Sequence, residues 1–406
     1  MQPSKRMKEK RLASFRGERE SLIYLDNAAT TFPKPPSVYE AVLRCMKEYG
    51  GNPGRSGHRL SMKAAEAVYD CRAELASLFG SRHPTNVVFT TNATASLNTA
   101  IQSLLGTLGE RRHILLSDIE HNSVLRPIVS SGCPYSVYRV GTTEEETLRN
   151  VKKALRADTG MIVCNHLSNV CGLTNPAEAI GRLCRERDIR FVLDVSQSAG
   201  SHRLHIGKIG ADCLCGPGHK GLYGPQGCGF LLFADAYAYE ETASRLSTVF
   251  AGGNGVASKE TSMPAFLPER LEAGTLPTPA IAGLCEGIRF VKGIGEDEIG
   301  RRTSALRERL KGNLSALGGI RVYGGDTPPC GSLLFDASSD PEQTAAALDH
   351  EGFALRSGFH CAPSVLERLG CGEFGALRAS FSYFNTAREI DLLTEAIETI
   401  IKKGTV

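Results

Sequence analysis

The 406-residue sequence lacks a strong charge of either sign, since 47 Lys and Arg residues nearly balance 44 Asp and Glu residues. The resulting net charge of +3 gives no support to a protein that binds nucleic acid or an anionic membrane. No apolar run approaches the roughly 18 residues that a membrane helix requires. The N-terminal residues also lack the apolar stretch of a secretion signal. We therefore expect a cytoplasmic protein with no membrane or nucleic-acid partner.

The first 20 residues depart from this balance, because they hold seven Lys or Arg residues and only three Asp or Glu residues. The rest of the chain is therefore close to neutral. A short basic stretch of this kind is typical of a solvated terminus rather than of a folded element. We predict that residues 1–21 form a flexible basic arm.

Although the sequence has 13 cysteines, it lacks C-x-x-C pairs at the spacing of zinc sites. Scattered cysteines in odd number, without an export signal, indicate reduced thiols in the cytoplasm. Cys213 and Cys215 lie two residues apart, so a strand would place both on one face, where we expect them to pack in the core. We expect no metal site.

The sequence also lacks internal repeats and low-complexity tracts. With 41% hydrophobic and 22% charged residues it has the composition of a folded globular protein. Apolar runs at 87–89, 114–116, 161–163, 191–193 and 230–233 alternate with helical patterns at 62–79, 97–105, 143–154 and 178–187. This alternation predicts an α/β fold with a mainly parallel sheet and helices on both faces.

A Gly- and Pro-rich stretch at 273–279 precedes a second region with fewer helices per strand. Here we predict helices at 281–292, 297–316, 341–350 and 387–402, and strands at 319–323, 331–336, 353–357 and 376–382. The pattern indicates a smaller α+β domain at 280–406. We therefore predict a large α/β domain at 22–279, whose first residues pack with the small domain, and read 237–279 as irregular connections.

Chemically useful side chains follow five of the predicted strands. A hydroxyl-rich helix start at 90–94 follows the first, and His121, Asn169 and Asp194 follow the next three. Lys220 follows the strand expected at Cys213 and Cys215. Because ligands bind outside the carboxyl ends of parallel strands, we expect these groups to meet at one rim of the sheet.

Pyridoxal 5′-phosphate is a ligand that matches this set of groups. Its aldehyde requires a lysine for a Schiff base, and its pyridine nitrogen requires an acidic partner. Its phosphate suits the N–H groups and hydroxyls at a helix N-terminus, and its ring can stack on an imidazole. The residues therefore predict a pyridoxal-phosphate site at this rim.

Eight stretches of the sequence resemble a known family. They are Tyr24–Thr31, Glu120–His121, Ser168–Val170, Asp194–Gln197, Gly218–Pro225, Glu272–Thr275, Arg356–Ala362 and Arg378–Ser380. Over residues 22–402 the chain resembles class V aminotransferase-like pyridoxal-phosphate enzymes, specifically cysteine desulfurases of the group with a short catalytic loop (group II). The resemblance implies fold type I and the conversion of L-cysteine to L-alanine, with the sulfur passed to an active-site cysteine as a persulfide.

The resemblance also implies the residues that hold the cofactor. Lys220 would form the Schiff base, Asp194 would pair with the pyridine nitrogen, and His121 would stack on the ring and take part in catalysis. Gln197 would contact the ring oxygen, and Asn169 would lie beside that oxygen and the substrate.

The phosphate contacts implied by the resemblance are Ala93, Thr94 and His219. Thr275 matches a position that reaches the phosphate of the other subunit, which implies a homodimer. Family members usually have Ser or Thr where this chain has Pro217, so one hydroxyl is missing here, and Ser196 or a residue of the other subunit is a candidate substitute.

For the substrate, the resemblance implies that Arg378 binds the carboxylate, with Asn169 and Ala28 beside it. Cys361 matches the nucleophile that takes the sulfur. Phe359 stands where many relatives have a second histidine, which leaves both the proton-transfer assignment and the usual sulfur acceptor open. The resemblance implies a sulfur-acceptor protein, such as a scaffold for iron–sulfur cluster assembly, without identifying it.

The sequence leaves three alternatives to a cysteine desulfurase open. The first is a selenocysteine lyase that uses the same residues on a selenium substrate. The second is a class V aminotransferase or another β-lyase in which Cys361 is incidental. The third is a non-catalytic protein that handles sulfur or clusters, against which the lack of C-x-x-C pairs counts.

Overall fold

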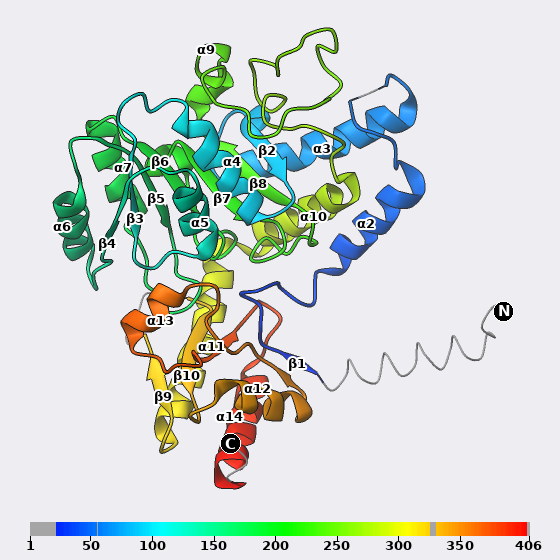
Figure 1. Ribbon diagram of the computed structural model, residues 1–406. Coiled ribbons are helices and arrows are strands. Elements are labelled where there is room, and N and C mark those ends of the chain that lie inside the picture. Colours follow the sequence, from blue (N-terminus) through cyan, green and yellow to red (C-terminus); the bar gives the residue numbers. More distant parts are fainter. Residues whose placement is uncertain (1–21, 55, 325–329, 404–406) are drawn as a thin grey trace.

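The computed structural model describes residues 22–54, 56–324 and 330–403. The predicted basic arm at 1–21 lies outside the described residues. Figure 1 shows a larger body with a central sheet and, below it, a smaller body that holds both β1 (Ile23–Tyr24) and the C-terminal helix α14 (Ala387–Lys403).

The larger body is built on a sheet that, in the described residues, has seven strands in the order β2-β8-β7-β6-β5-β3-β4. They are β2 (Val87–Thr90), β3 (His113–Ser117), β4 (Tyr135–Tyr138), β5 (Thr159–Asn165), β6 (Arg190–Asp194), β7 (Cys213–Pro217) and β8 (Gly229–Phe233). Neighbours from β7 to β4 pair in parallel, and β8 runs antiparallel to both β7 and β2. The α/β fold with a mainly parallel sheet is thereby confirmed.

Apart from the edge strand β4, in which Tyr135 and Val137 are exposed, the strands of this sheet are buried on both faces, which explains their continuous apolar runs. Leu115, Ile162 and Leu214 face one core cluster, whereas their neighbours Ile114 and Met161 face a second cluster on the other side. Cys213 and Cys215 both lie in the second cluster and are fully buried, as predicted.

Helices cover both faces of the sheet (Figure 1). Those of the larger body are α2 (Pro36–Glu48), α3 (Arg59–Leu78), α4 (Ala93–Leu105), α5 (Asn122–Ser130), α6 (Glu144–Ala154), α7 (Ala177–Glu186), α8 (Ile206–Ile209), α9 (Glu240–Ala243) and α10 (Thr278–Ile294), with 3-10 turns at Pro84–Asn86 and Asp235–Ala238. Apolar residues of α3, α7 and α10 join one core cluster, and those of α4 and α5 join the other.

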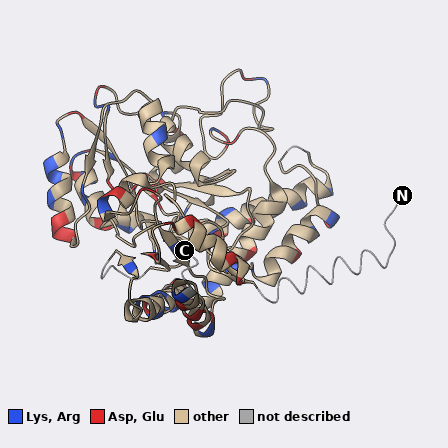
Figure 2. Cartoon of the chain, turned by 60° about the horizontal axis from the view of Figure 1, so that its bottom comes forward, with Lys and Arg blue, Asp and Glu red and all other residues tan. Residues whose placement is uncertain are grey.

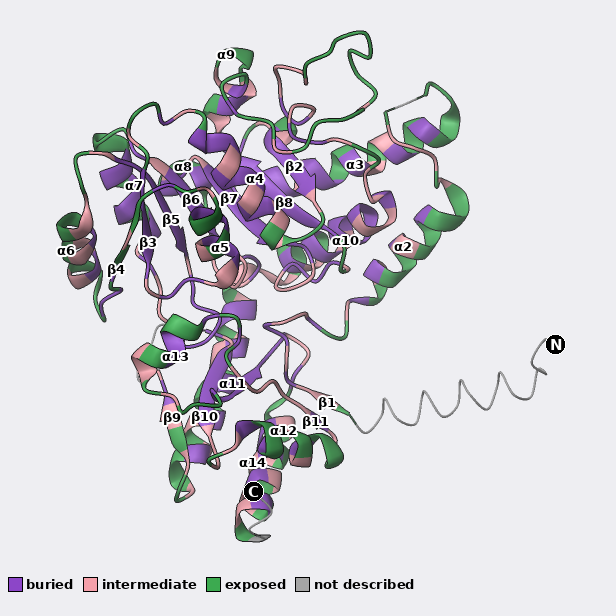
Figure 3. Cartoon of the chain, viewed as in Figure 1, coloured by how far each residue is buried: buried purple, intermediate pink, exposed green. Residues whose placement is uncertain are grey.

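The smaller body packs helices against a second sheet, whose order is β12-β10-β9 in the described residues. Its elements are α11 (Glu296–Ala316), β9 (Arg321–Tyr323), β10 (Ser332–Asp336), α12 (Pro341–His350), β11 (Phe353–Ala354), α13 (Pro363–Leu369), β12 (Leu377–Ser380) and α14. Leu25 joins its core, and β1 pairs in parallel with β11. Figure 3 shows buried residues concentrated inside each body.

Helix α10 crosses the predicted boundary at residue 280 and packs on the larger body. Its residues Ile281, Leu284 and Ile288 belong to the same core cluster as α3 and α7. The core of the smaller body takes its first helical residue, Leu306, from α11. We therefore propose a division near residue 295, between α10 and α11, in place of one at 280.

Local differences from the sequence prediction have physical causes. Helix α4 begins at Ala93 rather than 97, because the Asn92 side chain accepts a hydrogen bond from Ala95 N. The strand predicted at 353–357 is wrong beyond Ala354, where the chain turns toward the site. Helices α2, α5 and α13 were not predicted.

Charged residues of both signs are spread over the helices of both bodies, as Figure 2 shows. Helix α6 has three glutamates in its first turn and Lys152 and Lys153 in its last, an arrangement that complements the helix dipole. No helix in the described part of the chain has both the length and the apolar character needed to cross a membrane.

Candidate active site

A cavity of about 210 Å³ opens at the carboxyl ends of the parallel strands, and we call it the lysine cavity. Ten of the residues singled out from the sequence line it: Ala28, Ala93, Thr94, His121, Asn169, Asp194, Gln197, His219, Lys220 and Arg378. They come from both bodies. The predicted convergence at one rim is therefore seen in the geometry, whereas Cys361 and Thr275 do not line this cavity.

Lys220 and Asp194 are the oppositely charged pair of the lysine cavity. Asp194 ends β6, is buried, and accepts a hydrogen bond from Ser196 N at its Oδ1 (2.8 Å). Burial lowers the pKa of Lys220 to about 8, with Arg378 and Arg356 adding to the decrease and Asp194 opposing it. A lysine with this pKa has a substantial neutral fraction near pH 8, and only the neutral amine is a nucleophile.

The loop after Lys220 allows two segments of backbone to approach closely. A Cβ atom at Gly221 would lie 2.2 Å from the carbonyl oxygen of Ala199, so any larger residue would displace the loop. The glycine thus holds Lys220 near the segment that follows Asp194.

One end of the cavity offers donors to an anion. The N–H groups of Ala93 and Thr94 begin α4, and no acceptor lies opposite them among the described residues. His219 Nδ1 is buried and also lacks a hydrogen-bond partner in the described residues. Burial, Lys220 and Lys34 lower the pKa of His219 to about 4, so its ring is neutral at pH 7. Pro217 and Ser196 line the same cavity.

His121 caps the start of α5 and faces the cavity. Its Nδ1 accepts a hydrogen bond from Ser123 N (3.1 Å) and lies 2.6 Å from Ser123 Oγ. This acceptor role places the proton of the neutral ring on Nε2. Burial, followed by Lys220, lowers the pKa of His121 below its usual range.

Arg378 is the most deeply buried cation of the site, with a side chain only 1% exposed. Its Nη2 donates to Asp26 Oδ1 (2.7 Å) and its Nη1 donates to the Asn169 carbonyl (3.1 Å). Its Nε lacks a partner in the described residues, as does Asn169 Oδ1. Unsatisfied buried polar atoms that line a cavity are the groups that a ligand would satisfy.

Cys361 is the only exposed cysteine, and all 13 lie in the described part of the chain. Its Sγ is 3.6 Å from Arg356 Nη2, and Arg356 lines the lysine cavity. The thiol therefore lies at the mouth of the cavity, beside the guanidinium of Arg356.

The loop around Cys361 is held by its backbone. His360 and Cys361 have φ values of 50° and 58°, in the left-handed region that non-glycine residues seldom adopt. Asn122 N donates to the Cys361 carbonyl (2.9 Å), and Asn169 Nδ2 donates to the His360 carbonyl (2.9 Å). These contacts fix the loop in a tight turn, which limits how far the Cys361 thiol can travel.

Sequence reasoning missed two residues of the site, Arg356 and Glu120. Both lie in stretches that carried the resemblance, but nothing in their spacing distinguished them. Glu120 is buried beneath the site, where its carboxylate accepts from Ser117 Oγ and from Asn165 N (2.9 Å to Oε1). Burial, with Asp194 nearby, raises the pKa of Glu120 to about 8.

Thr275 lies apart from the lysine cavity. It is exposed, and its Oγ1 accepts a hydrogen bond from Asn52 Nδ2 (3.3 Å). Its expected contact with the phosphate of another subunit remains a prediction.

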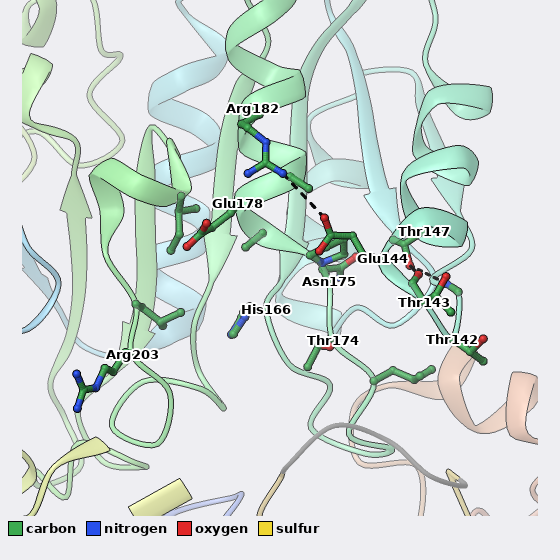
Figure 4. A pocket seen from close by; sticks show the side chains of 17 residues that line it. Thr142, Thr143, Glu144, Thr147, His166, Thr174, Asn175, Glu178, Arg182 and Arg203 are labelled. Atoms are coloured by element: carbon green, nitrogen blue, oxygen red, sulfur yellow. Dashed lines mark hydrogen bonds and ion pairs between the residues drawn. The ribbon is translucent and has the colours of Figure 1, made fainter. Parts of the chain in front are cut away.

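A second cavity, of about 590 Å³, lies between the β4–α6 loop and the start of α7, and we call it the rim cavity (Figure 4). Its charged side chains include Glu144, Glu178, Arg182 and Arg203. Figure 4 shows Arg182 directed toward Glu144, whereas Arg203 points away from both. In the described residues, no cluster of His, Cys, Asp or Glu in either cavity has the arrangement of a metal site.

Comparisons with known proteins agree with this geometry. Residues 23–393 match the family model described as aminotransferase class-V. A probable cysteine desulfurase from Methanothermobacter thermautotrophicus is 31% identical over 390 residues, which cover 94% of this chain and 95% of that protein. The cysteine desulfurase IscS from Tolumonas auensis is 32% identical and covers 94% of this chain and 93% of its own length.

Solved structures of cysteine desulfurases are similar to this chain over nearly its whole length. The apo structure of a cysteine desulfurase from Thermococcus onnurineus has a TM-score of 0.85 at 30% identity, covering 95% of this chain and 96% of that one. The cysteine desulfurase CsdA from Escherichia coli has a TM-score of 0.82 at 23% identity, covering 96% of this chain and 98% of that one, which shows a shared fold.

Proposed function

Because this chain belongs to the class-V aminotransferase family, and within it to the cysteine desulfurases, we propose that it converts L-cysteine to L-alanine with pyridoxal 5′-phosphate and takes the sulfur onto Cys361. The observation that carries the proposal is the exposed Cys361 thiol, beside Arg356, at the mouth of a cavity that holds Lys220 and Asp194. An aminotransferase has no need of a thiol in this position.

The residues of the lysine cavity fit the cofactor. Lys220 offers an amine with a pKa near 8, and Asp194 offers a buried carboxylate to the pyridine nitrogen. His219 Nδ1 and the N–H groups of Ala93 and Thr94 are available to the phosphate. When bound, pyridoxal phosphate supplies an electron sink for the carbon atoms of the substrate.

The remaining residues of the cavity surround the ring and its substituents. We assign His121 to the ring face and to proton transfer through Nε2, because Ser123 occupies Nδ1. Gln197 and Asn169 are assigned to the ring oxygen. Ser196, whose hydroxyl belongs to the cavity lining, is the candidate for the phosphate contact that Pro217 cannot make.

The substrate carboxylate is assigned to Arg378, with Asn169 and Ala28 beside it. Both Nη atoms of Arg378 already donate to protein acceptors, while its Nε lacks a partner in the described residues. A carboxylate would therefore reach Nε and share the Nη2 face with Asp26. Arg356, between Cys361 and the cavity, is the second cation within reach of the substrate.

Cys361 then removes the sulfur. Its thiolate attacks the substrate sulfur, so that a sulfur–sulfur bond forms while the bond between the substrate sulfur and Cβ breaks. The electron pair of the broken bond stays with the carbon skeleton, which gains a proton and leaves as alanine. The protein retains a persulfide on Cys361.

We also propose two kinds of partner. A second copy of the chain would cover exposed apolar side chains of α2 and α3, namely Tyr39, Leu43, Met46, Met62 and Tyr69. A sulfur-acceptor protein would come to Cys361, because the tight loop limits the reach of the persulfide. Free thiols throughout the described chain suit the cytoplasm as its location.

The test compares wild type with Cys361→Ala in assays of alanine and sulfide formed from L-cysteine, with pyridoxal phosphate and dithiothreitol present. We expect the wild type to make both products and the variant to lose at least about a hundredfold in rate while keeping the absorbance of lysine-bound cofactor. Cys371→Ala, at a half-buried cysteine, is the matched control and should resemble wild type. Full activity in Cys361→Ala would instead favour a lyase in which this thiol is incidental, and parallel assays with selenocysteine compare the two substrates.

A further inference from the structure

The segment from Asp26 to Lys34, which we call the strap, crosses from the smaller body to the loop that carries Lys220. In Figure 1 it is the blue chain between β1 and α2, along the junction of the two bodies. It has no helix or strand of its own, and its one bridge pairs Asp26 with Ser380. Nevertheless Asn27, Ala28 and Thr31 are buried.

At one end the strap is bonded to β12. Ala28 N donates to Ser380 Oγ (2.9 Å), and Asn27 Nδ2 donates to the Ser380 carbonyl (2.9 Å). Asp26 Oδ1 accepts from Arg378 Nη2 (2.7 Å), and no other carboxylate within the described residues lies within 4.0 Å of this guanidinium. Asp26 is therefore the counter-ion that orients Arg378.

At the other end the strap is bonded to the backbone of His219 and Lys220. The His219 carbonyl accepts from Thr31 N (3.0 Å), Thr30 Oγ1 (3.3 Å) and Lys34 Nζ (2.7 Å). The Lys220 carbonyl accepts from Thr31 Oγ1 (2.9 Å). Four donors on Thr30, Thr31 and Lys34 thus hold the two carbonyls that flank the Lys220 Cα atom.

Lys34 is unusual for a lysine near the surface. Burial lowers its pKa to about 7, and no carboxylate of the described chain lies within 4.0 Å of its Nζ. A lysine that merely extends into water would keep the pKa of a solvated amine. Lys34 therefore gives up part of its hydration to donate to the His219 carbonyl. A lysine that only extends into solvent would not do so.

We propose that the strap is a positioning element of the active site, in which Lys34 and Thr31 fix the peptide that carries Lys220 while Asp26 fixes Arg378. The inference rests on the proposed roles of Lys220 and Arg378. The strap thereby sets the separation between the amine that holds the cofactor and the cation that holds the substrate, which come from different bodies.

The Lys220 end is tested with Lys34→Met and Lys34→Arg, measured as purified apo-protein titrated with pyridoxal phosphate. We expect Lys34→Met to raise the dissociation constant about tenfold, the effect of losing the hydrogen bond to the His219 carbonyl, and Lys34→Arg to stay within about twofold of wild type. The absorbance of lysine-bound cofactor should also titrate at a shifted pH in Lys34→Met. Lys153→Met, at an exposed lysine of α6, is the matched control.

The Arg378 end is tested with Asp26→Asn and Asp26→Glu in steady-state kinetics on L-cysteine. We expect Asp26→Asn to raise KM about tenfold with a smaller change in kcat and no change in cofactor affinity, and Asp26→Glu to restore most of KM. Asp391→Asn, which breaks the exposed ion pair with Arg309, is the control for loss of an Asp–Arg pair.

Two results would overturn the proposal. One is cofactor affinity within twofold of wild type in Lys34→Met. The other is a Lys34→Arg protein that binds the cofactor as weakly as Lys34→Met, since a purely local packing role predicts no rescue by a second hydrogen-bond donor. The proposed function fails on a different observation, namely a wild-type protein that forms no alanine from cysteine. The cofactor titration does not depend on that activity.

Discussion

The lysine cavity and the rim cavity differ in the way their charges are held. The rim cavity has more than twice the volume of the lysine cavity. Its Arg182 and Glu144 are 3.9 Å apart, and its Arg203 pairs with Asp297 outside the cavity. All four of these side chains are more than half exposed. In the lysine cavity, Arg378 is 1% exposed and the pKa of Lys220 is lowered to about 8. Its charges are held in place by burial and by neighbours.

In this fold the larger cavity is therefore not the one that holds the reactive groups. Exposed ion pairs are screened by water and contribute little to stability, whereas buried groups of opposite charge interact strongly and in a fixed direction. Even His166, whose pKa in the rim cavity is lowered to about 3 by burial and by His202, is only a neutral ring, and no lysine or cysteine of the described residues lines that cavity. The smaller cavity has the amine, the carboxylate and the nearby thiol.

The largest effect is expected from removing the Lys220 amine from the lysine cavity. Lys220→Ala should lower alanine formation at least about a thousandfold, because no other lysine lines the cavity in the described residues. The absorbance of lysine-bound cofactor should disappear with it, as measured by visible spectroscopy of the purified protein.

The matched change in the rim cavity is Arg182→Ala. It removes a charge of the same sign from the larger cavity, and we expect less than about a twofold change in rate because its pair is exposed. A loss of activity in Arg182→Ala comparable to that in Lys220→Ala would mean that the two cavities act together, and the contrast between them would be wrong.

Much of the fold follows from local patterns that the sequence carries. The runs at 114–116, 161–163 and 191–193 lie in β3, β5 and β6 because strands buried on both faces must be apolar at successive positions. Helix α10 shows the limit: its apolar residues predict a helix, but only tertiary packing decides that the helix covers α3 of the larger body. Helix α13 follows a chain turn that periodicity does not encode.

In the candidate site, too, some residues can be predicted from the sequence and others only from the three-dimensional structure. Ten residues singled out from the sequence line one cavity because parallel strands deliver their ends to one rim. Arg356 and Lys34 were missed as functional residues, since a surface lysine or arginine has the same local signature as a buried one. Their roles depend on what stands opposite them, Cys361 Sγ and the His219 carbonyl, and that is information about three-dimensional contacts.

An intermediate effect is expected for the substrate carboxylate. Arg378→Lys keeps the charge but loses the planar guanidinium that reaches Asn169, Asp26 and a ligand at once. We expect KM for L-cysteine to rise between about tenfold and a hundredfold, with kcat changed less, in steady-state assays. Arg203→Lys at the rim cavity should leave both constants unchanged; equal effects of the two substitutions would contradict the assignment.

The smallest expected effect is on pH, and it probes the field inside the lysine cavity directly. Only neutral Lys220 can attack the cofactor aldehyde, and its folded pKa of about 8 lies below that of an ordinary lysine. The rate of cofactor capture by apo-protein, followed by stopped-flow absorbance, should therefore rise about tenfold from pH 7 to pH 9 and level off above about pH 9. An unperturbed amine would continue to gain up to about pH 10. Because Asp194 raises this pKa, Asp194→Asn should move the plateau to lower pH. A plateau that stays in place would show that burial alone, and not the paired charge, distinguishes this cavity from its larger neighbour.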